Sequence, residues 1–113
     1  WQWRVPFHQD GATAGMWLYE YTNGQDVLKI DTSGNQSIRG HVYPRTNNTY
    51  DLGSSSYRWR DIYTNDLNLS NEGSSNDVDG TWGDWTIQEG ESDLFLKNNR
   101  SGKKYKFNLT EVS

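Results

Sequence analysis

Residues 16–38 read MWLYEYTNGQDVLKIDTSGNQSI and hold the pattern that decides the fold. Met16–Tyr21 and Asp26–Asp31 are rich in aromatic and aliphatic side chains, and Asn23-Gly24 lies between them. Asn-Gly between two strand-like runs is a strong β-hairpin signal, because both central residues of the tight turn need a positive φ. The stretch therefore predicts two antiparallel strands joined at Asn23-Gly24.

Similar patterns continue on both sides of this hairpin. A second turn is expected at Ser33–Asn35, followed by a strand over Gln36–Tyr43. Toward the N-terminus, apolar and polar residues alternate with the period of a half-buried strand. The apolar positions are Trp1, Trp3, Val5 and Phe7. The first 43 residues are thus predicted to form a meander of short strands.

Composition excludes several classes of protein. Only 32% of the 113 residues are hydrophobic, yet 14% are aromatic, with six Trp and seven Tyr. The chain has no Cys, which excludes disulfides and Cys-ligated zinc. No apolar run approaches the roughly 20 residues that span a bilayer, so we expect no membrane insertion. The net charge is −4 with no basic block, so nucleic acid is not an expected partner.

The C-terminal half predicts further strands around a polar stretch. Strands are expected at Trp82–Gln88, Leu94–Lys97 and Lys104–Leu109, the last two joined by a five-residue loop at Asn98–Gly102. Tyr57–Arg60 is predicted to form one helical turn. We expect three parts: a β-meander over 1–69 that includes a distinctive segment at 48–70, an exposed linker over 70–80, and a β-hairpin module over 81–113.

The segment 48–70, NTYDLGSSSYRWRDIYTNDLNLS, resembles one found near the C-terminal end of tail fibre and tailspike proteins of tailed bacteriophages. The resemblance rests on Tyr50–Gly53, the serine turn after it, Tyr57–Trp59 and Asp61–Tyr63. In those proteins it often precedes an intramolecular chaperone of the endosialidase type, which is absent from this sequence. The chain begins at Trp1, not Met, which is typical of a piece of a longer protein.

The resemblance implies a virion structural protein, located on a phage tail or particle surface. The low apolar content favours burial against other chains, and the fibre type implies an intertwined parallel homotrimer. Its partners would be copies of itself and other virion proteins. The residues expected to pack between chains are Leu52, Trp59, Ile62 and Tyr63; filling an ordinary monomer core is their alternative role. Two other functions stay open: a virion decoration or head-fibre protein without receptor binding, and a monomeric carbohydrate-binding β-sandwich.

Chemical motifs favour binding over catalysis. His8 and His41 are far apart in the sequence and neither lies near a nucleophile motif, so we expect no enzyme activity and no cofactor. Residues 75–86 fail the calcium-loop pattern, because the twelfth position is Thr86 and not Glu, and no metal site is expected. Trp82, Asp84 and Trp85 could contact a bacterial cell-surface polysaccharide, with indole platforms beside a carboxylate acceptor.

Overall fold

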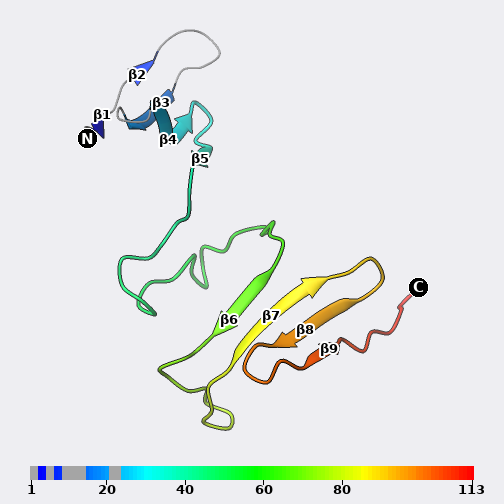
Figure 1. The fold of residues 1–113 in the computed structure, drawn as a ribbon. Helices are drawn as coiled ribbons and strands as arrows, with labels where there is room; N and C mark the ends of the chain where they lie inside the picture. Colours follow the sequence, from blue (N-terminus) through cyan, green and yellow to red (C-terminus); the bar gives the residue numbers. More distant parts are fainter. Residues whose placement is uncertain (1–2, 5–6, 9–14, 21–23) are drawn as a thin grey trace. The chain divides into compact units, whose positions relative to one another are not determined.

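The computed structural model describes residues 3–4, 7–8, 15–20 and 24–113, and the chain divides into two compact units, residues 1–52 and 53–113. Each unit contains one antiparallel β-sheet, and the described residues include no helix (Figure 1). The expected all-β fold of short antiparallel hairpins is therefore confirmed. Within the described ranges, no helix is long and apolar enough to cross a membrane.

The sheet of the first unit has the strand order β1-β3-β4-β5, with β2 also paired to β3. Its strands are β1 (Trp3–Arg4), β2 (Phe7–His8), β3 (Gly15–Glu20), β4 (Gln25–Asp31) and β5 (Gln36–Ile38). The hairpin predicted around residues 23–24 is confirmed, because β3 pairs with β4 from Gly15↔Asp31 to Glu20↔Gln25. The pairing ends at Glu20↔Gln25, so residues 21–24 connect the strands and the connection is longer than the tight turn expected at Asn23-Gly24. Gly24 has a φ of 68°, while Asn23 lies outside the described residues.

The turn between β4 and β5 is organised by one carboxylate. Oδ1 of Asp31 accepts hydrogen bonds of 2.9 Å from the backbone N–H groups of Ser33 and Asn35, and Oδ2 accepts one from Asn35 Nδ2. These bonds favour the charged form, so the pKa of Asp31 is lowered. The predicted turn is confirmed, but β5 ends at Ile38 and not at Tyr43, because Gly40 takes a φ of 133° and leaves the strand conformation.

The helical turn expected at Tyr57–Arg60 is wrong. A non-helical turn joins Ser54 and Tyr57 instead. The N–H of Ser54 donates to the carbonyl of Tyr57 at 3.0 Å, and the N–H of Tyr57 donates to Ser54 Oγ at 3.1 Å. Gly53 enters this turn with a φ of 86°. Serine satisfies the backbone here in a non-helical form, which is the known competition between short polar side chains and helix.

The sheet of the second unit is a four-stranded meander with the order β6-β7-β8-β9 (Figure 1). Its strands are β6 (Leu67–Ser70), β7 (Asp84–Glu89), β8 (Leu94–Asn98) and β9 (Lys104–Lys106). The five-residue loop is confirmed at the β8–β9 turn, where the Gly102 N–H donates to the Asn98 carbonyl and Gly102 has a φ of 76°. β9 is shorter than the predicted strand.

Residues 70–80 were expected to link two separate modules, but they lie within one sheet. Ser70 ends β6, and the residues after it connect β6 to β7, which are neighbours in the same sheet. The stretch is exposed apart from half-buried Asn71. The division of the chain falls between Leu52 and Gly53, inside the fibre-like segment, and not at this stretch.

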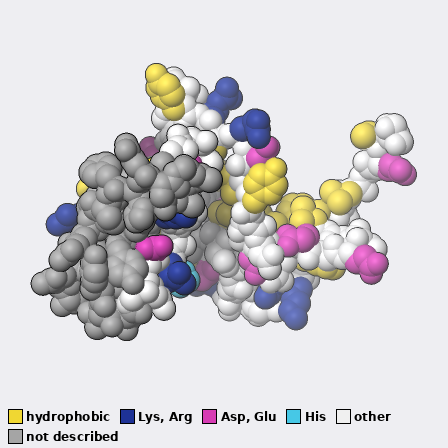
Figure 2. Space-filling view, turned by 90° about the horizontal axis from the view of Figure 1, so that it is seen from above, with side chains coloured by type: hydrophobic (Ala, Val, Ile, Leu, Met, Phe, Trp, Pro, Cys, Tyr) yellow, Lys and Arg dark blue, Asp and Glu magenta, His cyan; other side chains and the backbone are white. Residues whose placement is uncertain are grey.

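Residues 24–113 have no apolar core. Across residues 24–113 no hydrophobic side chain is buried, and the buried residue is Thr86, at 6% exposure. Figure 2 shows hydrophobic side chains uncovered on the face that it presents. The second unit is a single layer of sheet, so its apolar side chains have no second layer of the same unit to pack against.

Candidate functional site

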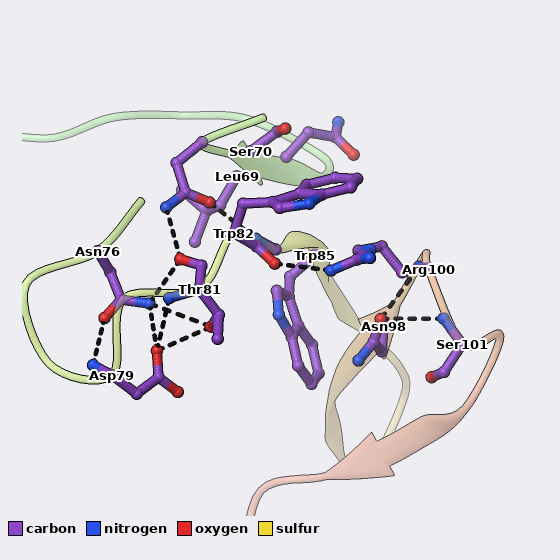
Figure 3. Close-up of a pocket in the computed structure, with 13 residues that line it drawn as sticks. Leu69, Ser70, Asn76, Asp79, Thr81, Trp82, Trp85, Asn98, Arg100 and Ser101 are labelled. Atoms are coloured by element: carbon purple, nitrogen blue, oxygen red, sulfur yellow. Dashed lines mark hydrogen bonds between the residues drawn. The ribbon is translucent and has the colours of Figure 1, made fainter. Parts of the chain in front are cut away.

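An open depression of about 960 Å³ lies at one end of the β6–β9 sheet. Its wall is built by the end of β6, the β6–β7 connection, the start of β7 and the β8–β9 turn (Figure 3). Two indoles, one guanidinium and several amide and hydroxyl groups line it. The principal side chains are Leu69, Asn76, Trp82, Trp85, Asn98 and Arg100.

The β6–β7 connection is held by its own side chains. Asn76 Oδ1 accepts hydrogen bonds from the backbone N–H groups of Val78 and Asp79, and Asn76 Nδ2 donates to the Thr81 carbonyl at 2.9 Å. Asp79 Oδ1 accepts from Thr81 Oγ1 at 2.7 Å and from Asn76 Nδ2 at 2.8 Å. The bonds from Thr81 and Asn76 lower the pKa of Asp79 by stabilising its charged form.

A second asparagine fixes the base of this connection. Asn71 Oδ1 accepts a hydrogen bond of 2.8 Å from the Gly83 N–H, and the Asn71 N–H donates to the Gly83 carbonyl at 3.3 Å. These contacts continue the β6–β7 pairing for one step beyond the strands. Trp82 is thereby held immediately before β7, at the rim of the depression.

Trp82 and Trp85 enter the depression from different local structures (Figure 3). The guanidinium of Arg100 lies 3.7 Å from the Trp82 ring centroid, and its Nη1 donates to the Trp82 carbonyl at 3.0 Å. Trp85 belongs to β7, opposite Leu69 on β6 and Asn98 on β8. Its indole edge is so close to Gly83 that a Cβ there would stand 3.0 Å from Trp85 Nε1.

Two of the three polysaccharide-contacting residues expected from the sequence come together. Trp82 and Trp85 line the same depression, because Trp82 lies outside β7 and strand alternation does not separate the two side chains. Asp84 does not line it: its Oδ1 accepts a hydrogen bond from Asn99 Nδ2 at 3.0 Å. Arg100 was missed by sequence reasoning, because its approach to Trp82 arises from hairpin pairing and has no local signal.

Comparison with protein-family models, curated proteins and solved structures finds no match for this chain.

The residues expected to pack between chains are exposed in the single chain. Their exposed fractions are 80% for Leu52, 65% for Trp59, 73% for Ile62 and 91% for Tyr63. The edge of the Trp59 indole lies beside Gly53, 3.6 Å from where a Cβ would stand. The alternative in which these residues fill the core of a single chain does not hold, because none of them is buried.

Titratable groups in the described ranges do not gather into a metal site. Within those ranges no group of three or more His, Asp or Glu side chains is arranged to hold a metal ion. His41 is exposed and lies 5.9 Å from the ring of Tyr43. What the depression offers chemically is stacking on indole faces and hydrogen bonding from amide, hydroxyl and guanidinium groups.

Proposed function

We propose that this chain is a structural subunit of a homotrimeric virion fibre of the tail fibre or receptor-binding type. The observation that carries the proposal is the lack of any buried hydrophobic side chain across residues 24–113. Apolar groups left in water do not stabilise a fold, so these side chains need a partner surface. The resemblance of 48–70 to a phage fibre segment supports the virion as the setting.

The surface area of the chain supports the same proposal. The accessible area is 10521 Å². Two separate compact units of half this mass would together expose roughly 7,700 Å² by the size scaling of folded proteins. The surplus of about 2,800 Å² exceeds the roughly 800 Å² that each partner buries in a standard interface. A chain of this kind has ample surface to bury against other copies.

The mass of the protein in solution tests this proposal. Light scattering at micromolar concentration should return about three times 13.1 kDa. Dilution should not yield a folded monomer, because residues 24–113 of each chain bury no hydrophobic side chain. A compact species of 13.1 kDa that resists unfolding would overturn the proposal and favour the monomeric carbohydrate-binding alternative.

Contact with host polysaccharide is the second candidate function, and the shared depression of Trp82 and Trp85 favours it. Sugar rings stack on indole faces, and their hydroxyl groups bond to amides such as that of Asn98. Each site would be weak, but three identical sites on one particle gain avidity. A trimeric protein would then bind host cells far more tightly than one site allows.

A cell-binding assay tests this second function. Trp82→Ala should reduce binding to host cells, while Tyr43→Ala, which removes another exposed aromatic ring, should leave it unchanged. Both variants are first compared with the wild type for oligomeric mass. Equal binding by Trp82→Ala and the wild type would exclude this depression as the receptor site. A trimer that ignores every host would favour the decoration or head-fibre alternative.

A further inference from the structure

The two faces of the β6–β9 sheet differ sharply in polarity. Pairing of Leu69 with Trp85 and of Leu67 with Ile87 places these four side chains on one face. Ile87 also pairs with Leu96, and Leu96 pairs with Tyr105, so the same face continues across the sheet. We call this set the apolar face. It comprises Leu67, Leu69, Trp85, Ile87, Leu96 and Tyr105.

The opposite face is largely polar, apart from Phe95, which pairs with Gln88 and Lys106. Thr86 Oγ1 donates to Asn68 Oδ1 at 2.7 Å, and Gln88 Nε2 donates to Asp66 Oδ2 at 3.0 Å. Lys97 and Lys104 pair with each other across β8 and β9 on this side. The polar face is therefore suited to water, which leaves the apolar face as the one that needs covering.

No second sheet of this unit covers the apolar face. Leu67, Leu69 and Tyr105 are 48%, 49% and 47% exposed, and the remaining members are half-buried by their neighbours in the sheet. Residues 53–113 are all described, and their only strands are β6, β7, β8 and β9. A second layer therefore has to come from outside this unit.

We propose that the apolar face is the surface on which a second copy of this chain packs. The proposal rests on the proposed function and specifies which surface makes the oligomer. The six members of the apolar face carry no charge; Glu89, whose pairing with Leu94 puts it on the same side of the sheet, is exposed at the end of β7 and lies outside this set. Copies can therefore bring the six residues together without charge repulsion. Three copies around a three-fold axis can each turn this face toward the axis, so that every sheet packs against the sheets of its neighbours.

Charge and area both favour a second copy over other occupants. A nucleic acid needs lysine or arginine on the contacted face, and the apolar face has none. Obligate interfaces between copies of a chain are more apolar than transient ones, which matches the apolar area that this face exposes. Because Leu69 and Trp85 also line the depression, the second copy would cover that side of the candidate receptor site, whereas Trp82 at the rim is not part of the apolar face.

Matched aliphatic-to-Asp substitutions test the proposal in the full chain. Leu69→Asp places a charge on the apolar face of every copy, and should raise the apparent dissociation constant at least about 100-fold, leaving monomer at micromolar concentration. Val78→Asp makes a similar change at an exposed loop residue and should leave the oligomer intact. Mass is measured by light scattering, and strand content by far-ultraviolet circular dichroism.

The outcomes separate this proposal from the proposed function. If Leu52→Asp dissolves the oligomer and Leu69→Asp does not, the fibre-like segment is the interface and the apolar face is not. If wild type is a folded monomer, both proposals are wrong. Leu69→Thr keeps a good strand former while removing apolar area, and should weaken association about 10-fold with unchanged strand content. If Leu69→Asp proves too damaging to fold, a folded Leu69→Thr of full wild-type affinity still overturns the proposal.

Discussion

The guanidinium of Arg100 lies 3.7 Å from the centroid of the Trp82 indole and is bonded through Nη1 to the Trp82 carbonyl. Arg100 belongs to the β8–β9 turn, whereas Trp82 precedes β7. One side chain therefore joins two turns that are separate in the sequence. This contact positions the indole that forms the rim of the depression.

Replacing Arg100 should destabilise the second unit. Arg100→Ala removes a cation–π contact of about 0.5–1 kcal/mol and a hydrogen bond of about 0.5–1.5 kcal/mol. We expect a loss of about 1–2 kcal/mol in urea unfolding and a change in tryptophan fluorescence. Arg58→Ala removes an equally charged, exposed side chain and should leave both measurements unchanged. An equal effect of the two variants would contradict the stabilising role of Arg100.

Local turn chemistry explains why much of the fold could be predicted from the sequence. Gly24, Gly34 and Gly102 all take positive φ at turns that the sequence indicated. The ends of strands and the form of loops were less predictable. Gly40 ends β5 earlier than expected, and the Ser54 hydroxyl bonds to the Tyr57 N–H in a turn where a helical turn was expected. Glycine and serine are each compatible with several backbone conformations, and strand pairing elsewhere in the chain decides which one is adopted.

The candidate site could be predicted only in part. Trp82 and Trp85 could be identified as candidate platforms because two indoles lie close together in the sequence beside a carboxylate. Asp84 precedes Trp85 on β7, so strand alternation directs it to the opposite face; its hydrogen-bond partner there, Asn99, is set by the β7–β8 register. Arg100 depends on the same register. Pairings across a sheet have no signature in either strand alone, so these contacts were beyond sequence reasoning.

Gly53→Ala should disturb the turn beside Trp59. The added Cβ would stand 3.1 Å from the Tyr57 carbonyl oxygen, at a backbone φ of 86°. Gly73 has a φ of 85° but open space around it, so Gly73→Ala reports the conformational strain alone. We expect Gly53→Ala to cost about 1 kcal/mol more than Gly73→Ala in thermal unfolding. If the two variants lose the same stability, the Tyr57 carbonyl moves away from the added Cβ at no energetic cost.

Acid should loosen the β6–β7 connection through Asp79. Its pKa is lowered from the ordinary 3.8, chiefly by Thr81 and then by Asn76. A lowered folded pKa means that the stabilisation is complete above the unfolded pKa and is lost as pH falls through the folded one. NMR titration of the Asp79 carboxyl should show this lowered pKa. Asp79→Asn should remove the acid dependence of hydrogen exchange at Thr81; if that dependence persists, another group is responsible.

Thr86 should be the most sensitive polar residue of the second sheet. It is buried, and its Oγ1 donates to Asn68 and accepts from Asn99 Nδ2 at 2.9 Å. Thr86→Val keeps the shape and removes both bonds, at an expected cost of about 1–3 kcal/mol in urea unfolding. Thr86→Ser keeps the hydroxyl and should recover most of that loss. A Ser variant as unstable as the Val variant would show that methyl packing dominates.

Gly83 should matter because the Trp85 indole lies against it. An alanine Cβ would stand 3.0 Å from Trp85 Nε1 and 3.1 Å from Cδ1. Gly83 does not have a positive φ, so alanine meets crowding there without backbone strain. The indole is half-buried and has some room to rotate, so Gly83→Ala should cost about 1 kcal/mol, the low end of overpacking penalties.

A double-mutant cycle with Trp85→Val isolates this contact. Valine is a good strand former that does not reach Gly83, so Gly83→Ala should cost almost nothing in the Trp85→Val background. The expected coupling is at least about 0.5 kcal/mol, measured by urea unfolding of all four proteins. The fluorescence of Trp85 should shift in Gly83→Ala, since the indole has to leave its place in the depression. Purely additive costs with unchanged fluorescence would mean that Gly83 does not position Trp85, and that the shape of the depression is set by Arg100 and Asn71 instead.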